Sequence, residues 1–139
     1  MHFDSEQALQ SFVASFESGT FPKSEWTHAS HLAMASYYLW RFPLREATTR
    51  IRNGIRHYNV SQGGVNTAES GYHETLTIYW IQRIAEYLAE MPEGTNFLKA
   101  VHGLVERYRA RRDLFKDYYS FDVVNSMEAR ARWVPPDLK

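Results

Sequence analysis

The chain has 139 residues, a length typical of one domain that buries a single sizeable core. Lysine plus arginine and aspartate plus glutamate each number 16, so the formal net charge is zero and no overall field attracts nucleic acid or an anionic membrane. The chain has no cysteine, which excludes disulfides, a thiol nucleophile and thiolate metal ligands. Any metal would have to be bound by nitrogen and oxygen atoms.

The N-terminal sequence, MHFDSEQAL, has acidic residues where a signal peptide would carry a basic region and an apolar run. No other stretch approaches the length of a membrane span. We therefore expect a cytoplasmic location, with neither a membrane nor a nucleic acid as partner.

Apolar residues at helical spacing predict three helices in the first half of the chain. The first covers about residues 5–16, and the second covers about residues 24–42 and carries His28 and His31. The third covers about residues 43–57.

The sequence Ser61-Gln62-Gly63-Gly64 is the most loop-like stretch and precedes a fourth predicted helix over about residues 70–91. That helix is apolar on nearly every side, so we expect it to be the buried central element. A fifth helix is predicted from Phe97 toward Arg111. Residues 113–139 are expected to add one or two short helices and an extended tail.

No segment shows the strict alternation of a half-buried strand, and no internal repeat is present. We therefore predict an all-α fold, a four- to five-helix bundle with a short helical or extended C-terminal tail. Residues 1–139 are expected to form one helical domain.

Two local motifs carry residues suited to chemistry. In Trp26-Thr27-His28-Ala29-Ser30-His31-Leu32 the two histidines are three apart, so they are neighbours on one helix face and could reach a single cation. Both histidines share stripes with apolar residues and are expected at or beside the core.

The second motif, Gly71-Tyr72-His73-Glu74-Thr75, opens the fourth predicted helix. His73 is in line with Leu76 and Trp80 there, and Glu74 is in line with Ile78 and Ile81. Both polar side chains are therefore expected at the mouth of apolar stripes.

If the second and fourth helices present their N-terminal turns to one cavity, three imidazoles can converge. His28, His31 and His73 are then the predicted ligands of one divalent metal, and Glu74 is the predicted general base. Zinc, nickel, iron and copper all accept such ligands. The corresponding function is a metal-dependent hydrolase or lyase that acts on a small molecule.

The same residues also fit a metal-free polar pocket or a polar network that only specifies packing. The alternative function is a non-catalytic helical module that binds a small ligand or another protein. Aromatic residues make up 15% of the chain, which leaves a homodimer open as well.

Other polar groups give weaker signals. His57 is expected to interact with the C-terminal dipole of the third helix, and His102 is expected to pack in the fifth.

The loop Asn59–Thr67 could contact a substrate, act as a lid or simply connect two helices. A basic cluster is interpreted as a paired, solvated face, with an anion or nucleic-acid contact as the alternative. Its members are Arg107, Arg109, Arg111 and Arg112.

The ordered set WTHASHL, GYHET and SMEARARWVPPDL resembles a family of small bacterial helical proteins with no assigned function. The resemblance covers most of the chain. It implies that His28, His31, His73 and Glu74 are signature positions of the group, together with Ser126 and Arg130.

A looser similarity is to metal-binding four-helix proteins of the DinB type, whose Trp-initiated second helix also carries a histidine. The present chain has no later His-x-x-x-His pair, which those proteins use to complete their metal site. No metal site is carried over from this similarity.

Overall fold

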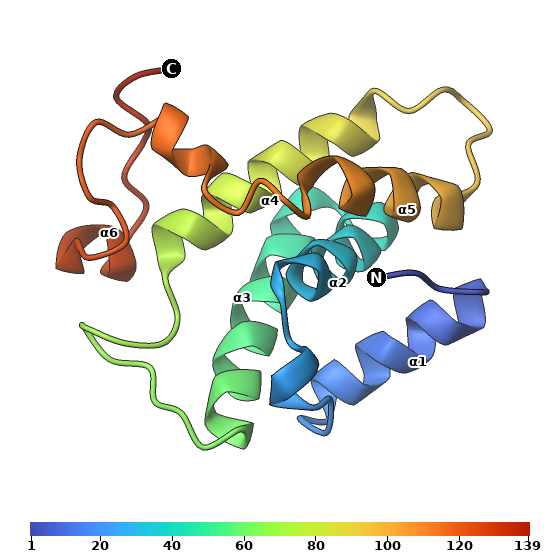
Figure 1. Cartoon of the computed structure of the whole chain (residues 1–139), viewed down its shortest axis with the longest axis horizontal. Coiled ribbons are helices and arrows are strands. Elements are labelled where there is room, and N and C mark those ends of the chain that lie inside the picture. Colours follow the sequence, from blue (N-terminus) through green and yellow to red (C-terminus); the bar gives the residue numbers. More distant parts are fainter.

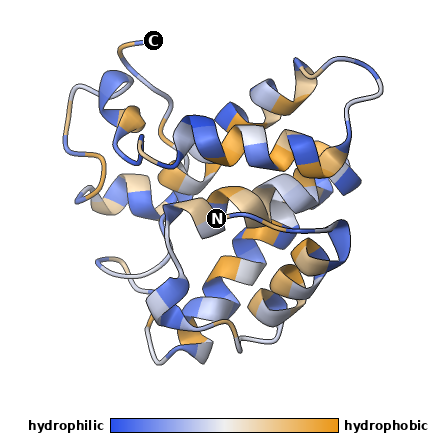
Figure 2. Cartoon of the chain, turned by 45° about the vertical axis from the view of Figure 1, so that its right-hand side comes forward, coloured by the Kyte–Doolittle hydropathy of each residue, from blue (hydrophilic) through white to orange (hydrophobic).

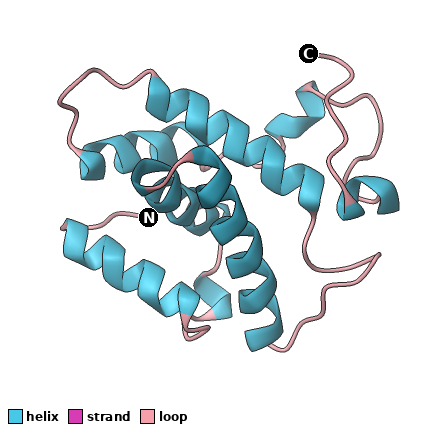
Figure 3. Ribbon diagram, turned by 180° about the vertical axis from the view of Figure 1, so that it is seen from behind, coloured by secondary structure: helices cyan, strands magenta, loops and turns pink.

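The computed structural model describes all 139 residues and contains helices and loops but no strand (Figure 3). The predicted all-α class is confirmed. No helix combines the length and the apolar character needed to cross a bilayer. In chain order the elements are α1 (Glu6–Glu17), the 3₁₀ helix η1 (Lys23–Glu25), α2 (His28–Arg41), α3 (Leu44–Ser61), α4 (Glu74–Ala89), α5 (Phe97–Tyr108), the 3₁₀ helix η2 (Leu114–Asp117) and α6 (Met127–Ala131).

Most helices begin where a side chain caps the exposed backbone. The Ser5 hydroxyl accepts a hydrogen bond from the Ala8 N–H at 3.1 Å and starts α1. Thr27 and Ser30 form a capping box at the start of α2, and the Ser30 hydroxyl also donates to the Glu25 carbonyl at 2.9 Å. The first turn of α2 is therefore fixed both to its own cap and to η1.

The central helix of the bundle is α2, which packs against α3, α4 and α5 (Figure 1). Seven of its residues are buried, compared with four in α4, so the expectation that the fourth helix is the central element is wrong. Small buried side chains at Ala33, Ala35 and Ser36 let neighbouring helices approach closely. On α4, Leu76 and Trp80 are only half-buried.

The apolar residues divide into two cores. The larger contains 19 buried residues from α1 to α5 and the N-terminal segment, and the smaller contains five. Figure 2 shows the apolar residues as stripes along the helices rather than as complete coats. The smaller core lies between α4 and the chain that follows α5, and consists of Tyr79, Phe115, Tyr119, Val123 and Ala129.

Thr75, in the first turn of α4, attaches the end of the chain to the bundle. Its buried hydroxyl donates to the Arg132 carbonyl at 2.8 Å and accepts from the Val134 N–H at 3.0 Å. The Tyr119 hydroxyl donates to the Val134 carbonyl at 2.7 Å. These contacts hold the C-terminal segment against the start of α4, as the predicted packed tail requires.

Helix boundaries differ from the predicted ones at two places near the motifs. α3 continues to Ser61, so the loop begins only at Gln62. α4 begins at Glu74 rather than near Ser70, and His73 is its N-cap. The GYH sequence therefore belongs to the loop, which places His73 outside the helix that was expected to carry it.

Thr75→Val should destabilise the fold by about 2 kcal/mol, because the isosteric side chain leaves two backbone groups without a partner. Urea denaturation measures the change. Thr49→Val is the matched control, since the Thr49 hydroxyl is exposed and bonds only within α3, and its effect should stay within about 0.5 kcal/mol. Equal losses in both variants would contradict the anchoring role of Thr75.

Candidate functional site

A cavity of about 650 Å³ lies where the first turns of α2 and α4 meet the C-terminal half of α3. Its volume is in the range of pockets that enclose small molecules. Of the 27 residues that line it, 15 are hydrophobic, so an apolar body would be well accommodated. The aliphatic part of the wall includes Leu32, Ile51, Ile55, Leu76, Ile81 and Ile84.

All three predicted histidines line this cavity. The His28 ring meets the Trp80 ring edge-on with centroids 4.6 Å apart, and the His31 ring lies 4.3 Å from the Trp26 ring. The N-terminal turns of α2 and α4 therefore do face a common space. The three imidazoles do not form a cluster, however, because no group of three or more His, Asp or Glu side chains is placed to hold a metal ion.

His73 uses both ring nitrogens inside the protein. Nδ1 accepts from the Leu76 N–H at 3.2 Å and caps α4, and Nε2 lies 2.9 Å from the Val123 carbonyl. Since a carbonyl only accepts, Nε2 carries the proton and the ring is neutral. Burial lowers the pKa of His73, in agreement with this neutral state. To bind a metal, His73 would have to give up at least one of these hydrogen bonds.

His31 has one ring nitrogen engaged and one unused. Its Nδ1 lies 3.0 Å from the Thr27 carbonyl, which requires the proton on Nδ1 and leaves the Nε2 lone pair as an acceptor. Burial lowers the pKa of His31 and the charge of Arg112 lowers it further, despite the opposing hydrogen bond to Thr27. The half-buried ring therefore presents a neutral acceptor at the cavity wall.

His28 is the least satisfied polar group of the site. Its Nε2 is buried and has no hydrogen-bond partner. Burial, followed by the nearby His31 and Arg112, lowers the pKa of His28 to about 4, against the opposing effect of the nearby Tyr108 backbone carbonyl. The ring is thus neutral near neutral pH.

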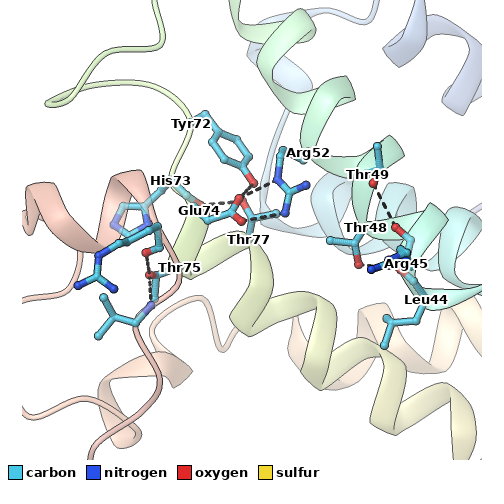
Figure 4. Close-up of polar contacts among 12 residues, drawn as sticks. Leu44, Arg45, Thr48, Thr49, Arg52, Tyr72, His73, Glu74, Thr75 and Thr77 are labelled. Atoms are coloured by element: carbon cyan, nitrogen blue, oxygen red, sulfur yellow. Dashed lines mark hydrogen bonds and ion pairs between the residues drawn. The ribbon is translucent and has the colours of Figure 1, made fainter.

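Glu74, the predicted general base, is engaged elsewhere and is not among the residues that line the cavity. Arg52 donates to both of its carboxylate oxygens, at 2.9 and 2.8 Å, and the Tyr72 hydroxyl donates to one of them (Figure 4). Burial raises the pKa of Glu74, but the bonds from Arg52 and Tyr72 and the Arg52 charge outweigh it, so the pKa is below its usual range. A carboxylate stabilised in this way is a weak base.

The loop from Gln62 to His73 closes one side of the cavity and is held by several contacts. The Asn66 amide oxygen accepts from the Tyr72 N–H at 3.0 Å. Gly71 has a φ of +83° and lies so close to the Val65 carbonyl that a Cβ atom would be 2.1 Å from that oxygen. The backbone at Gly71 therefore admits no other residue without rearrangement.

Ser126 and Arg130, the other implied signature positions, also have structural contacts. The Ser126 hydroxyl caps α6 by accepting from the Ala129 N–H at 3.1 Å. The Arg130 guanidinium donates to the Gly71 carbonyl at 2.7 Å and to the Val124 carbonyl at 3.3 Å. Arg130 and His73 thus join the GYHET motif to the C-terminal segment, whereas Ser126 stabilises α6 within that segment.

Arg112 lines the cavity, although it belongs to the basic cluster that was predicted to be a paired, solvated face. Arg109 and Arg111 pair with the carboxylates of Glu106 and Asp117, as interpreted for the basic cluster, whereas Arg107 makes no ion pair and lies over the Tyr87 and Tyr108 rings. Arg112 makes no ion pair and lines the cavity instead. Helical spacing did not distinguish it, because Arg111 also has no carboxylate three or four positions away and yet pairs with Asp117.

No family model, curated protein or solved structure matches the chain. The resemblance to a bacterial helical family stays a prediction, and the function has to be argued from the site itself.

Glu74→Gln should destabilise the protein by about 2 kcal/mol at about pH 7, because it removes a half-buried ion pair between α3 and α4. The pKa of Glu74 is lowered in the folded state, so this stabilisation is present above its ordinary value of 4.5 and is lost as the pH falls through the lowered pKa. Urea denaturation at about pH 7 and about pH 3 should show the difference shrinking in acid.

Glu46→Gln is the matched control. Glu46 also pairs with an arginine of α3, but both side chains of that pair are 47% exposed, so its loss should cost less than about 1 kcal/mol. A Glu74→Gln variant as stable as the control variant would contradict the anchoring role assigned to Glu74.

Proposed function

We propose that the protein binds a small molecule with an apolar body in the cavity between α2, α3 and α4. The observation that carries this proposal is a space of about 650 Å³ with mainly hydrophobic walls, into which His31 presents an unused Nε2 acceptor. Small-molecule sites typically combine such apolar walls with a few polar groups that orient the ligand. The neutral His28 ring lines the same cavity, although its Nε2 is closed to solvent.

The loop from Gln62 to His73 supports binding of a molecule in a largely preformed site. Gly64, Val65, Ser70 and Gly71 line the cavity, and the hydrogen bond from Tyr72 to Asn66 fixes this part of the loop. A wall that is already ordered loses little conformational entropy when a ligand enters. Of the alternatives for this loop, contact with the bound molecule is therefore favoured over movement as a lid.

The neutral fluorescent molecule N-phenyl-1-naphthylamine tests the proposal, because its emission rises in an apolar site. We expect saturable binding to the wild-type protein. Ile55→Trp adds a bulky ring to a residue of the cavity wall, so it should weaken binding about tenfold or more. Fluorescence titration measures both dissociation constants.

Val60→Trp is the control for this substitution. Val60 lies on the same helix, is 60% exposed and does not line the cavity, so the same new side chain there should leave the dissociation constant within about twofold. Absence of saturable binding, or equal effects of the two variants, would overturn the proposal. Circular dichroism confirms that both variants are folded.

The second candidate function is the predicted metal-dependent hydrolase or lyase. The observation in its favour is that His28 and His31 lie on the same cavity wall, close enough for one charge to affect the pKa of the other. The third predicted ligand, His73, has both nitrogens engaged, and Glu74 is paired with Arg52. For these reasons we place ligand binding without a metal first.

Metal analysis of the protein purified without a histidine tag distinguishes the two candidates. We expect much less than one equivalent of zinc, nickel, iron or copper, and no rise in melting temperature when these ions are added. A stoichiometric metal that is lost in both His28→Ala and His31→Ala would instead favour the metal-dependent function.

A homodimer and a cytoplasmic location also stay predictions. Sedimentation of the purified protein tests the first, and fractionation of cells that produce the protein tests the second.

A further inference from the structure

The charged residues of the cavity wall all have the same sign. None of the 27 residues that line the cavity is an aspartate or a glutamate, although these two types number 16 in the chain. The lining includes Lys23 and Arg112, and neither of them makes an ion pair within the protein. A chain with zero net charge thus has a cavity that favours anions.

Arg112 is the cation closest to the unused polar groups of the site. Burial is the main cause of the lowered pKa of His28 and His31, and the charge of Arg112 lowers both values further. The guanidinium therefore lies near both rings. It is placed in the turn that follows α5, and the side chain is exposed. Arg112 makes no hydrogen bond to either imidazole or to any other group of the protein, so its donors are free for an anion.

The other cavity amides and hydroxyls are largely occupied by the protein. The Tyr58 hydroxyl donates to the Phe21 carbonyl at 2.6 Å, and the Gln62 amide donates to the Gly19 carbonyl at 2.7 Å. The Asn59 amide donates to Asn66 at 3.1 Å. Strong donors without a partner in the protein are therefore concentrated at Arg112 and Lys23.

The aromatic side chains near the imidazoles suit a planar apolar group. Trp26 and Trp80 both line the cavity, and each lies against one of the two histidines. Aromatic rings contribute a large contact area at low cost in side-chain entropy. A ligand with a flat body would contact these rings while its polar end reached the cavity mouth.

We propose that the ligand is an organic anion, a planar or otherwise apolar body with one carboxylate-like group that Arg112 binds. This inference rests on the proposed function, because it names the chemical class of the molecule in the same cavity. A guanidinium binds such a group through two parallel hydrogen bonds, which fixes its orientation as well as its charge.

Two probes with one skeleton test the charge requirement. 8-Anilinonaphthalene-1-sulfonate has the ring system of N-phenyl-1-naphthylamine with one added sulfonate. In Arg112→Gln we expect the dissociation constant of the sulfonate to rise about tenfold and that of the neutral probe to change less than about twofold. Arg112→Lys keeps the charge but loses the two parallel donors, so it should recover only part of the lost affinity.

Arg111→Gln is the matched control, since Arg111 is the adjacent arginine, pairs with Asp117 and does not line the cavity. It should leave both dissociation constants within about twofold. If the neutral probe binds in the cavity but Arg112→Gln weakens both probes equally or neither, the anion assignment is wrong and the proposed function stands. If neither probe binds to the wild-type protein, both proposals fail.

Discussion

One imidazole, that of His73, holds the start of α4 and the C-terminal segment together. Nδ1 takes the place of the usual Ser, Thr, Asn or Asp oxygen as the helix cap, and Nε2 donates to the Val123 carbonyl. Thr75 fixes the same turn to residues 132 and 134, and Arg130 fixes the loop before it. Because these contacts set where α4 begins, they also set the wall that α4 contributes to the cavity.

The helical pattern of the sequence was sufficient for the fold class because α1, α3 and α5 are amphipathic, each with one buried apolar face. Which helix is the most buried could not be predicted in the same way. α4 has more large apolar residues, yet several of them line the cavity or remain half-buried, whereas α2 gains its central position from small residues such as Ala33 and Ser36. Close approach of helices depends on side-chain volume, which an apolar count does not describe.

The candidate site was predictable in location but not in the roles of its residues. His28, His31 and His73 all line one cavity, and the first two share a helix face as their spacing predicts. Helical spacing could not show that Arg52, distant in sequence, would engage Glu74, or that His73 would precede the helix rather than lie in it. Arg112 was grouped with its neighbours because the turn that separates it from α5 is decided by tertiary contacts.

Nearly all buried polar side chains of the protein have hydrogen-bond partners, and one exception lies in the cavity wall. Buried Ser30, Ser36 and Thr75 all find backbone partners, so the fold can satisfy the polar groups that it encloses. Only three buried side-chain polar atoms lack a partner, and one of them, His28 Nε2, belongs to the cavity wall. A leucine or methionine there would fill similar space without leaving a polar atom unpaired. The His28 Nε2 atom is closed to solvent, so a ligand would reach it only if the wall moved, whereas the exposed Arg112 and Lys23 can be neutralised by a bound anion without such a change.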